Sequence, residues 1–261
     1  MDATAEQTKG LSGRLSRRGL IGAGLGAVAL GRSETARAQD PILGPELQYE
    51  AFVPSAVKQG QYYWYTCEFD AAWIVLKTFG IDPTFEEQLA VVGWDQDPEP
   101  WYEESAEGVL IHGGDPTVAF CGDYQHSFLA RLRSQAMRKL FDHHGLESRP
   151  IRGTAGIRSI LRRGGLAWMK VTVDFLPYTP ATWVTPDGRR FPTAFTNDHA
   201  VVVSAYNNDV VLIQDPLGPT DTNWDRQFRY EVPWAQFVAS AEAHGWDGLA
   251  VRPMPVATAS R

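Results

Sequence analysis

Two residues near position 65 have the types and spacing needed for nucleophilic catalysis by a thiol. Cys67 is followed by apolar residues at three- and four-residue steps, a helical pattern that ends at Gly80. A cysteine that opens a helix lies beside unpaired backbone N–H groups and the positive end of the helix dipole, which favour a thiolate. Gln61 lies six residues upstream of Cys67, where its side-chain amide could donate to an oxyanion that forms beside the sulfur.

His199 and Asp215 supply a candidate base and a group to orient it. His199 stands near the start of an apolar, β-rich run, residues 207–209 read as a turn, and 210–214 read as the returning strand. The first residue of one antiparallel strand lies close to the last residue of its partner, so we expect His199 and Asp215 to be neighbours. The carboxylate would fix the imidazole tautomer. Asp198 is a rival carboxylate, but adjacent strand residues point to opposite faces, so it should turn away from His199.

These elements, in this order, resemble papain-like cysteine peptidases, and among them the bacteriocin-processing, double-glycine type. The matching segments are Gln61 with Cys67, the loop GGDPTVAFCGDY at 113–124, the strand DHAVVV, the turn DPLG at 215–218 and the stretch RQFRYEVPWAQFV. The resemblance covers roughly residues 50–250. It implies Cys67 as nucleophile, His199 as base, Asp215 as orienting carboxylate and Gln61 as oxyanion donor, with no cofactor.

One position departs from the pattern of that family. Such domains usually have a small residue, often glycine, directly after the cysteine, whereas this chain has Glu68. A carboxylate in the first turn suits the helix dipole, but an anion beside Cys67 opposes formation of the thiolate.

The predicted fold class is α+β, with a helical part that carries Cys67 packed on an antiparallel sheet that carries His199 and Asp215. Further expected elements are listed here: a short strand near 47–53, a helix after a Thr84–Glu87 capping box, a helix at 127–145, strands at 146–151 and 167–173, a helix capped by Thr154, a hairpin at 182–193, a helix that begins at Pro233 and a last strand at 246–253. Residues 93–124 lack a regular pattern and are acidic and aromatic. We expect them to form a loop that lines the substrate cleft.

The first 38 residues have the pattern of a twin-arginine export signal. Arg17 and Arg18 precede about 13 mostly apolar residues, too short a run for a permanent membrane span, and Ala36–Ala38 offers a small-x-small cleavage site. We therefore expect a mature chain from Gln39 in the periplasm or outside the cell, with a peptidase-like domain at 39–252 and a flexible tail at 253–261.

The charge balance limits the class of partner. The first 38 residues hold six basic and three acidic side chains, so a whole-chain charge of −7 leaves −10 on the remainder. Such an acidic chain is a poor partner for nucleic acid or for an anionic membrane surface. The expected partner is a peptide or protein substrate.

Alternatives remain open both for Cys67 and for the function of the domain. Cys67 and Cys121 are the only cysteines, so in an exported chain they could form a disulfide, which would remove the nucleophile, or Cys67 could be an inert buried thiol. The domain could then be a catalytically silent module that binds a peptide or a cell-wall component. A transamidase would use the same triad.

His143 and His144 invite a metal assignment, but adjacent helical residues diverge by about 100° and no further ligand spacing completes a site.

Overall fold

The computed structural model describes residues 48–220 and 223–254. The helices are α1 (Cys67–Thr78), α2 (Phe85–Val92), α3 (Ser134–His143), α4 (Gly153–Arg162), the one-turn helix η2 (Val173–Phe175) and α5 (Trp234–Glu242). The strands are β1 (Ala51–Phe52), β2 (Trp94–Asp95), β3 (Trp101–Ser105), β4 (Gly108–His112), β5 (Phe120–Cys121), β6 (Leu146–Pro150), β7 (Leu166–Thr172), β8 (Pro180–Val184), β9 (Arg190–Ala194), β10 (Asp198–Tyr206), β11 (Val210–Gln214), β12 (Arg229–Pro233) and β13 (Gly248–Pro253). The fold is α+β, as predicted. The proposed export signal and most of the proposed tail lie outside the described residues.

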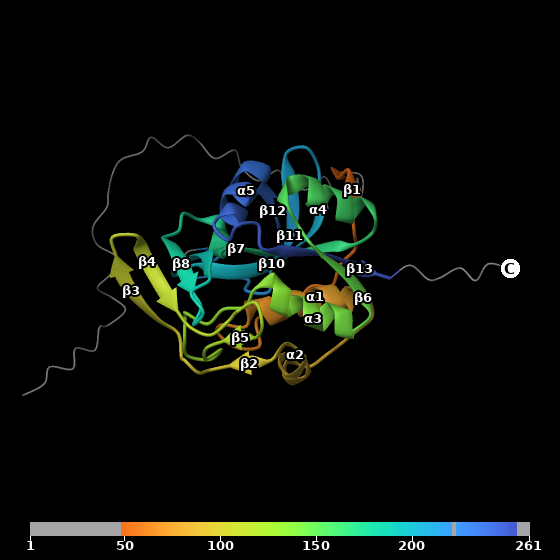
Figure 1. Ribbon diagram of the computed structural model, residues 1–261. Coiled ribbons are helices and arrows are strands. Elements are labelled where there is room, and N and C mark those ends of the chain that lie inside the picture. The colour runs from red at the N-terminus through yellow and green to blue at the C-terminus, as the bar shows by residue number, and fades with distance from the viewer. Residues whose placement is uncertain (1–47, 221–222, 255–261) are drawn as a thin grey trace, which may run out of the picture. The chain divides into compact units, whose positions relative to one another are not determined.

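A seven-stranded antiparallel sheet forms the centre of the described fold. Its order is β12-β11-β10-β7-β13-β6, and β1 pairs with the far end of β10. Figure 1 shows α1 and α3 on one side of this sheet and α4 and α5 on the other. Since helices cover both faces, the central strands are buried on both sides, which explains why β7 and β10 are nearly continuous apolar runs.

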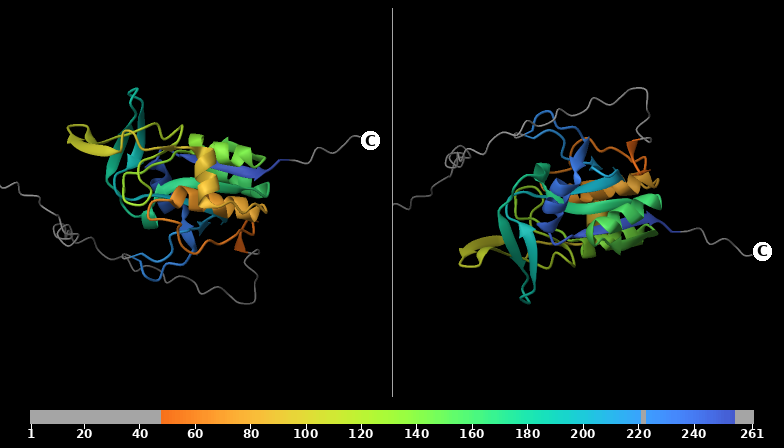
Figure 2. Two further views of the ribbon diagram at one scale, coloured as in Figure 1. Left: turned by 90° about the horizontal axis from the view of Figure 1, so that it is seen from below. Right: turned by 90° about the horizontal axis from the view of Figure 1, so that it is seen from above.

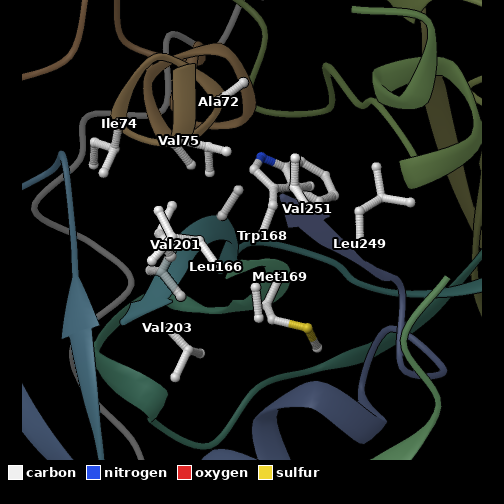
Figure 3. Packing of buried hydrophobic residues seen from close by; sticks show 14 of the residues in the cluster. Ala72, Ile74, Val75, Leu166, Trp168, Met169, Val201, Val203, Leu249 and Val251 are labelled. Carbon is white, nitrogen blue, oxygen red and sulfur yellow. The ribbon is translucent and has the colours of Figure 1, made fainter. Parts of the chain in front are cut away.

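The core lies on both faces of the sheet, and one part of it is packed between α1 and the sheet. Ala72 and Val75 of α1 face Trp168 of β7 (Figure 3), whereas Val201 pairs with Met169 on the other face. Trp168 is fully buried, and its indole N–H donates to the backbone oxygen of Glu68 at 3.0 Å. This contact fixes the first turn of α1, and therefore the position of Cys67, against the central sheet.

A second, four-stranded sheet has the order β3-β4-β8-β9. It lies to one side of the helices in both views of Figure 2. The predicted hairpin at 182–193 is confirmed as β8 and β9, but the prediction that residues 93–124 lack regular structure is wrong, because β2, β3, β4 and β5 lie in this range. All five residues of β3 are exposed, so no alternation of apolar residues marks the strand in the sequence. It forms by pairing with β4.

Two glycines allow the close packing beneath this sheet. A Cβ atom on Gly113 would lie 2.4 Å from the ring of Trp183, and one on Gly114 would lie 2.3 Å from a carboxylate oxygen of Asp95. Trp183 is buried, and its indole N–H donates to the backbone oxygen of Gly114 at 3.0 Å. The glycine pair of the 113–124 segment is therefore required for packing, since any side chain there would collide with its neighbours.

The helix boundaries follow local capping chemistry in part. The capping box is confirmed, because Thr84 accepts from the Glu87 N–H and Glu87 accepts from the Thr84 N–H. The helix predicted at 127–145 begins only at Ser134, and the predicted cap Thr154 lies inside α4, whose cap is Arg152. Pro233 caps α5 and is not its first residue. Within the described ranges, no helix is both long and apolar enough to cross a membrane.

Candidate active site

Cys67 is the first residue of α1, and its side chain is buried. Its thiol donates to Oε2 of Glu68 at 3.2 Å. Burial raises the pKa of the Cys67 thiol well above its usual value, and the charges of Glu68 and Asp198 raise it further, while Lys170 opposes them. The position at the helix start predicted a lowered pKa. Burial and the neighbouring carboxylates outweigh the helix dipole in this arrangement.

The segment before Cys67 is attached to the turn that follows Asp215. Gly60, at φ +100°, donates its backbone N–H to the backbone oxygen of Pro216 at 3.1 Å. Two residues later, the N–H of Tyr62 donates to the Asp70 carboxylate at 3.1 Å. Gln61 lies between these two anchored positions and is partly buried. The backbone of the proposed oxyanion donor is therefore held between α1 and the end of β11.

His199 and Asp215 are in direct contact. His199 is the second residue of β10, and Asp215 directly follows β11. Nε2 of His199 lies 2.9 Å from Oδ1 of Asp215, and the two side chains are 2% and 0% exposed. The antiparallel pairing of β10 with β11 places Gln214 opposite Val202, so Asp215, the next residue, lies within reach of His199 near the start of β10.

Three further groups hold the Asp215 carboxylate. It accepts from the guanidinium of Arg226, from the hydroxyl of Tyr230 at 2.7 Å and from the backbone N–H of Leu217 at 2.9 Å. Burial acts to raise the pKa of Asp215, but His199 and Arg226 overcome it and lower the pKa to about 2. Asp215 is therefore a carboxylate at neutral pH, able to orient the imidazole and to stabilise its protonated form.

A second buried cluster adjoins Cys67 on the opposite face of the sheet from His199. Lys170 of β7 donates to Glu68 at 2.5 Å and to Asp198 at 2.6 Å, and all three side chains are at least 95% buried. Burial acts to raise the pKa of Asp198, but Lys170 and Arg131 lower it to about 2. As predicted from strand alternation, Asp198 turns away from His199.

Sequence reasoning missed Lys170 and the role of Asp198 in this cluster. One signal was available: Lys170 interrupts the apolar strand 166–172, and a lysine in a buried strand requires anionic partners. Strand alternation predicted that Asp198 lies on the opposite face of the strand from His199, but it did not predict which cation pairs with the Asp198 carboxylate. That partner comes from a strand 28 residues earlier in the chain.

The structure brings His199 to Asp215 and Cys67 to Glu68, but it does not bring these two pairs together, because Lys170 and Asp198 beside Cys67 lie on the other face of the sheet from His199. Across residues 48–220 and 223–254, no hydrogen bond joins the Cys67 sulfur to the His199 ring. Both cysteines are free thiols, and Cys121 donates to the backbone oxygen of Ala119 at 3.5 Å. The disulfide considered from the sequence is not formed in this structure.

No metal centre emerges from the described part of the chain. The His143 and His144 rings contact each other edge to face at the end of α3, with centroids 5.0 Å apart. Among the residues that the structure describes, no three His, Cys, Asp or Glu side chains are grouped as ligands for a metal ion.

Comparison with solved structures supports the fold assignment. A Bacillus anthracis protein, provisionally described as a C39-like peptidase, superposes with a TM-score of 0.59 at 16% identity, over 78% of this chain and 98% of that protein. At this level of identity the match defines the fold alone, which is that of a C39-like peptidase.

Comparison by sequence gives one further relative. The uncharacterized protein YvpB of Bacillus subtilis (strain 168) is 27% identical over 138 residues, which is 49% of this chain. The aligned part covers 52% of YvpB, so the chain spans about half the length of this curated relative. No protein-family profile matches the chain.

Proposed function

We propose that the protein is an exported, thiol-dependent peptidase that uses Cys67, His199 and Asp215. The observation that carries the proposal is the buried hydrogen bond between His199 and Asp215. A buried histidine fixed by an ionised aspartate is the base-and-orienter pair that thiol and hydroxyl nucleophiles require. Its presence in a chain with the fold of a C39-like peptidase, and with a cysteine at the start of α1, favours peptide hydrolysis.

In the proposed reaction, the Cys67 thiolate attacks the carbonyl carbon of a peptide bond. The backbone N–H of Cys67 and the side-chain amide of Gln61 donate to the oxyanion. His199 protonates the leaving amine and then removes a proton from the water that hydrolyses the thioester. Asp215 keeps the imidazole in one tautomer throughout. The reaction needs no cofactor.

Two features of the backbone around Cys67 support these roles. The backbone bond from Gly60 to Pro216 ties the Gln61 segment to the turn after Asp215. No side chain caps the start of α1. The N–H groups of Phe69 and Asp70 donate to the backbone oxygen of Thr66, so the N–H groups of Cys67 and Glu68 are the ones that would serve an oxyanion beside the sulfur.

The proposed substrate is a peptide or isopeptide outside the cytoplasm. Export through the twin-arginine route remains a prediction from the first 38 residues, as does a double-glycine preference from the family resemblance. We also keep the proposal that residues 93–124 line the substrate cleft. Trp101 and Tyr102 of β3 are about half exposed, at 50% and 46%, and are accessible to a peptide.

Cleavage of a peptide library tests the proposal. The chain from residue 39 is incubated with a proteome-derived peptide mixture, and new termini are identified by mass spectrometry. We expect cleavage by the wild type and by the matched control Cys121→Ala, and none by Cys67→Ala or His199→Ala. Cleavage that persists in Cys67→Ala, or a wild type that produces no new termini, contradicts a thiol peptidase.

A variation of this experiment separates the alternatives. A primary amine added as acceptor yields amide products if the enzyme is a transamidase. A silent binding module would retain peptides without forming any product. Both readouts come from the same reaction mixture.

A further inference from the structure

Asp215 divides its two carboxylate oxygens between the histidine and an arginine. Oδ1 lies 2.9 Å from Nε2 of His199 and also accepts the backbone N–H of Leu217. Oδ2 accepts from the guanidinium of Arg226 and from the hydroxyl of Tyr230. The side chains of Asp215 and Arg226 are 0% and 1% exposed. The carboxylate that contacts the histidine therefore has a positive charge on its other oxygen, where solvent ions screen it little.

Arg226 is fixed by two further side chains. Its guanidinium donates to the Tyr230 hydroxyl at 3.1 Å and lies 3.0 Å from the carboxylate of Asp174 in η2. Burial and the charge of Asp215 raise the pKa of the Tyr230 hydroxyl, so this group stays uncharged. The charges that follow His199 along this chain of contacts are Asp215, then Arg226, then Asp174.

A buried cluster lies on the other face of β10 from His199. It is made of the side chains of Glu68, Arg131, Lys170, Asp198 and His244. Burial lowers the pKa of His244 to about 3, so this ring is neutral near pH 7. The cluster then holds two carboxylates and two cations, and its charges balance. The charge that acts on the His199 ring is therefore set mainly on its own face of the sheet.

We propose that Arg226 controls the proton affinity of His199 by offsetting the charge of Asp215. A buried carboxylate in contact with an imidazole favours the protonated ring and, without compensation, holds it protonated near pH 7. The proposed roles of His199 require a ring that both gains and loses a proton in this range. A cation on the other carboxylate oxygen weakens the attraction for the imidazolium and leaves the orienting contact in place. Arg226 is a positioning residue, because it acts through Asp215.

Asp174 reduces this effect but does not cancel it. Its carboxylate contacts Nη1 of Arg226, whereas Asp215 contacts Nη2. Asp174 is thus the more remote charge in the chain of contacts that starts at the His199 ring. Because the Coulomb energy falls with distance, the nearer cation outweighs the more remote anion. The inference deepens the proposed function, since it uses the role given there to His199, but protonation of the ring is measured without any substrate.

Titration of the His199 ring by NMR tests the proposal. The full chain carries isotope-labelled histidine, His199→Gln assigns the signal, and the pH of half protonation is compared between variants. In Arg226→Met we expect this midpoint to rise by at least about one pH unit, the effect of a charge about 4–6 Å away on a titrating group. Arg226→Lys keeps the charge and should recover most of the difference. Arg190→Met, at an exposed arginine that pairs with Glu107, is the matched control and should titrate like the wild type.

The single variant leaves two buried carboxylates without their cation, which destabilises the fold. The double variant Arg226→Met with Asp174→Asn removes this ion pair as a whole, and it serves if Arg226→Met does not fold. We expect the midpoint to rise here too, because the nearer of the two charges was the cation. An unchanged or lower midpoint in the folded variant overturns the proposal. So does an Arg226→Lys protein that titrates like Arg226→Met, because the charge would then not be the cause.

Cleavage data separate this inference from the proposed function. If both hold, cleavage by Arg226→Met on the acid side of its pH profile falls about tenfold for each pH unit that the midpoint rises. If the wild type cleaves peptides and the midpoint does not move, only the role of Arg226 is removed. If the midpoint rises as expected and the wild type cleaves nothing, the peptidase proposal is removed and the effect of Arg226 on His199 stands.

Discussion

The stability of this protein should depend on the protonation of His244, which adjoins the cluster beside Cys67. His244 is 1% exposed, and burial lowers its pKa from 6.5 to about 3. The unfolded chain takes up a proton on this side chain as the pH falls through 6.5, whereas the folded protein does so only near pH 3. The unfolded state therefore binds more protons between these values, and the free energy of unfolding falls as the pH is lowered through this window.

The magnitude follows from the two pKa values. Protonation of His244 in the unfolded chain costs about 0.2 kcal/mol of folding stability at about pH 7 and about 2 kcal/mol at about pH 5. For a domain of this size, that difference corresponds to a loss of ~4–8 °C in melting temperature. Asp70 acts in the opposite direction, because burial raises the pKa of its carboxyl to about 7. The wild-type profile alone therefore does not isolate His244.

Comparison with His244→Gln isolates the contribution, because glutamine does not titrate. Melting temperatures of wild type and variant are measured by circular dichroism between about pH 7 and about pH 5. We expect the variant to lose ~4–8 °C less than the wild type over this range. His126→Gln, at a histidine side chain that is 78% exposed, controls for removal of an imidazole elsewhere. Parallel profiles for the wild type and His244→Gln would refute the assignment of a buried neutral ring.

Two further predictions concern stability. Asp215→Asn should cost at least about 2 kcal/mol near neutral pH, because the pKa of this buried carboxyl is about 2 in the folded protein and 3.8 without its partners. The depressed pKa contributes stability above pH 3.8 that is lost as the pH falls through about 2, so the penalty measured by urea unfolding should shrink toward that pH. Thr84→Ala should lower the free energy of unfolding by about 1 kcal/mol through loss of the capping box. Peptide cleavage should be unaffected, and a loss of cleavage in a folded Thr84→Ala protein would contradict a purely local role for α2.

Local sequence signals were sufficient for the elements that carry the proposed triad. A helical period after Cys67 placed the cysteine at the start of α1. A short turn between two apolar runs predicted that His199 and Asp215 are neighbours, and their side chains are in contact although a β-bulge between Val203 and Ala205 shifts the register of the hairpin. The signals failed for β3, whose exposed residues show no apolar alternation. They also failed for the start of α3, because residues 127–133 form a turn and a bridge between Arg131 and Cys121 instead of a helix.

The sequence by itself determined the fold class and the two halves of the candidate site, since each half depends on neighbours within one helix or one hairpin. The tertiary structure alone decided which charges surround the sulfur. Lys170 lies 102 residues from Glu68 along the chain, and only the packing of α1 on β7 and β10 brings their charges together. Burial then makes those charges dominant, because a desolvated thiol responds to its nearest carboxylate and cation more strongly than to the dipole of its helix.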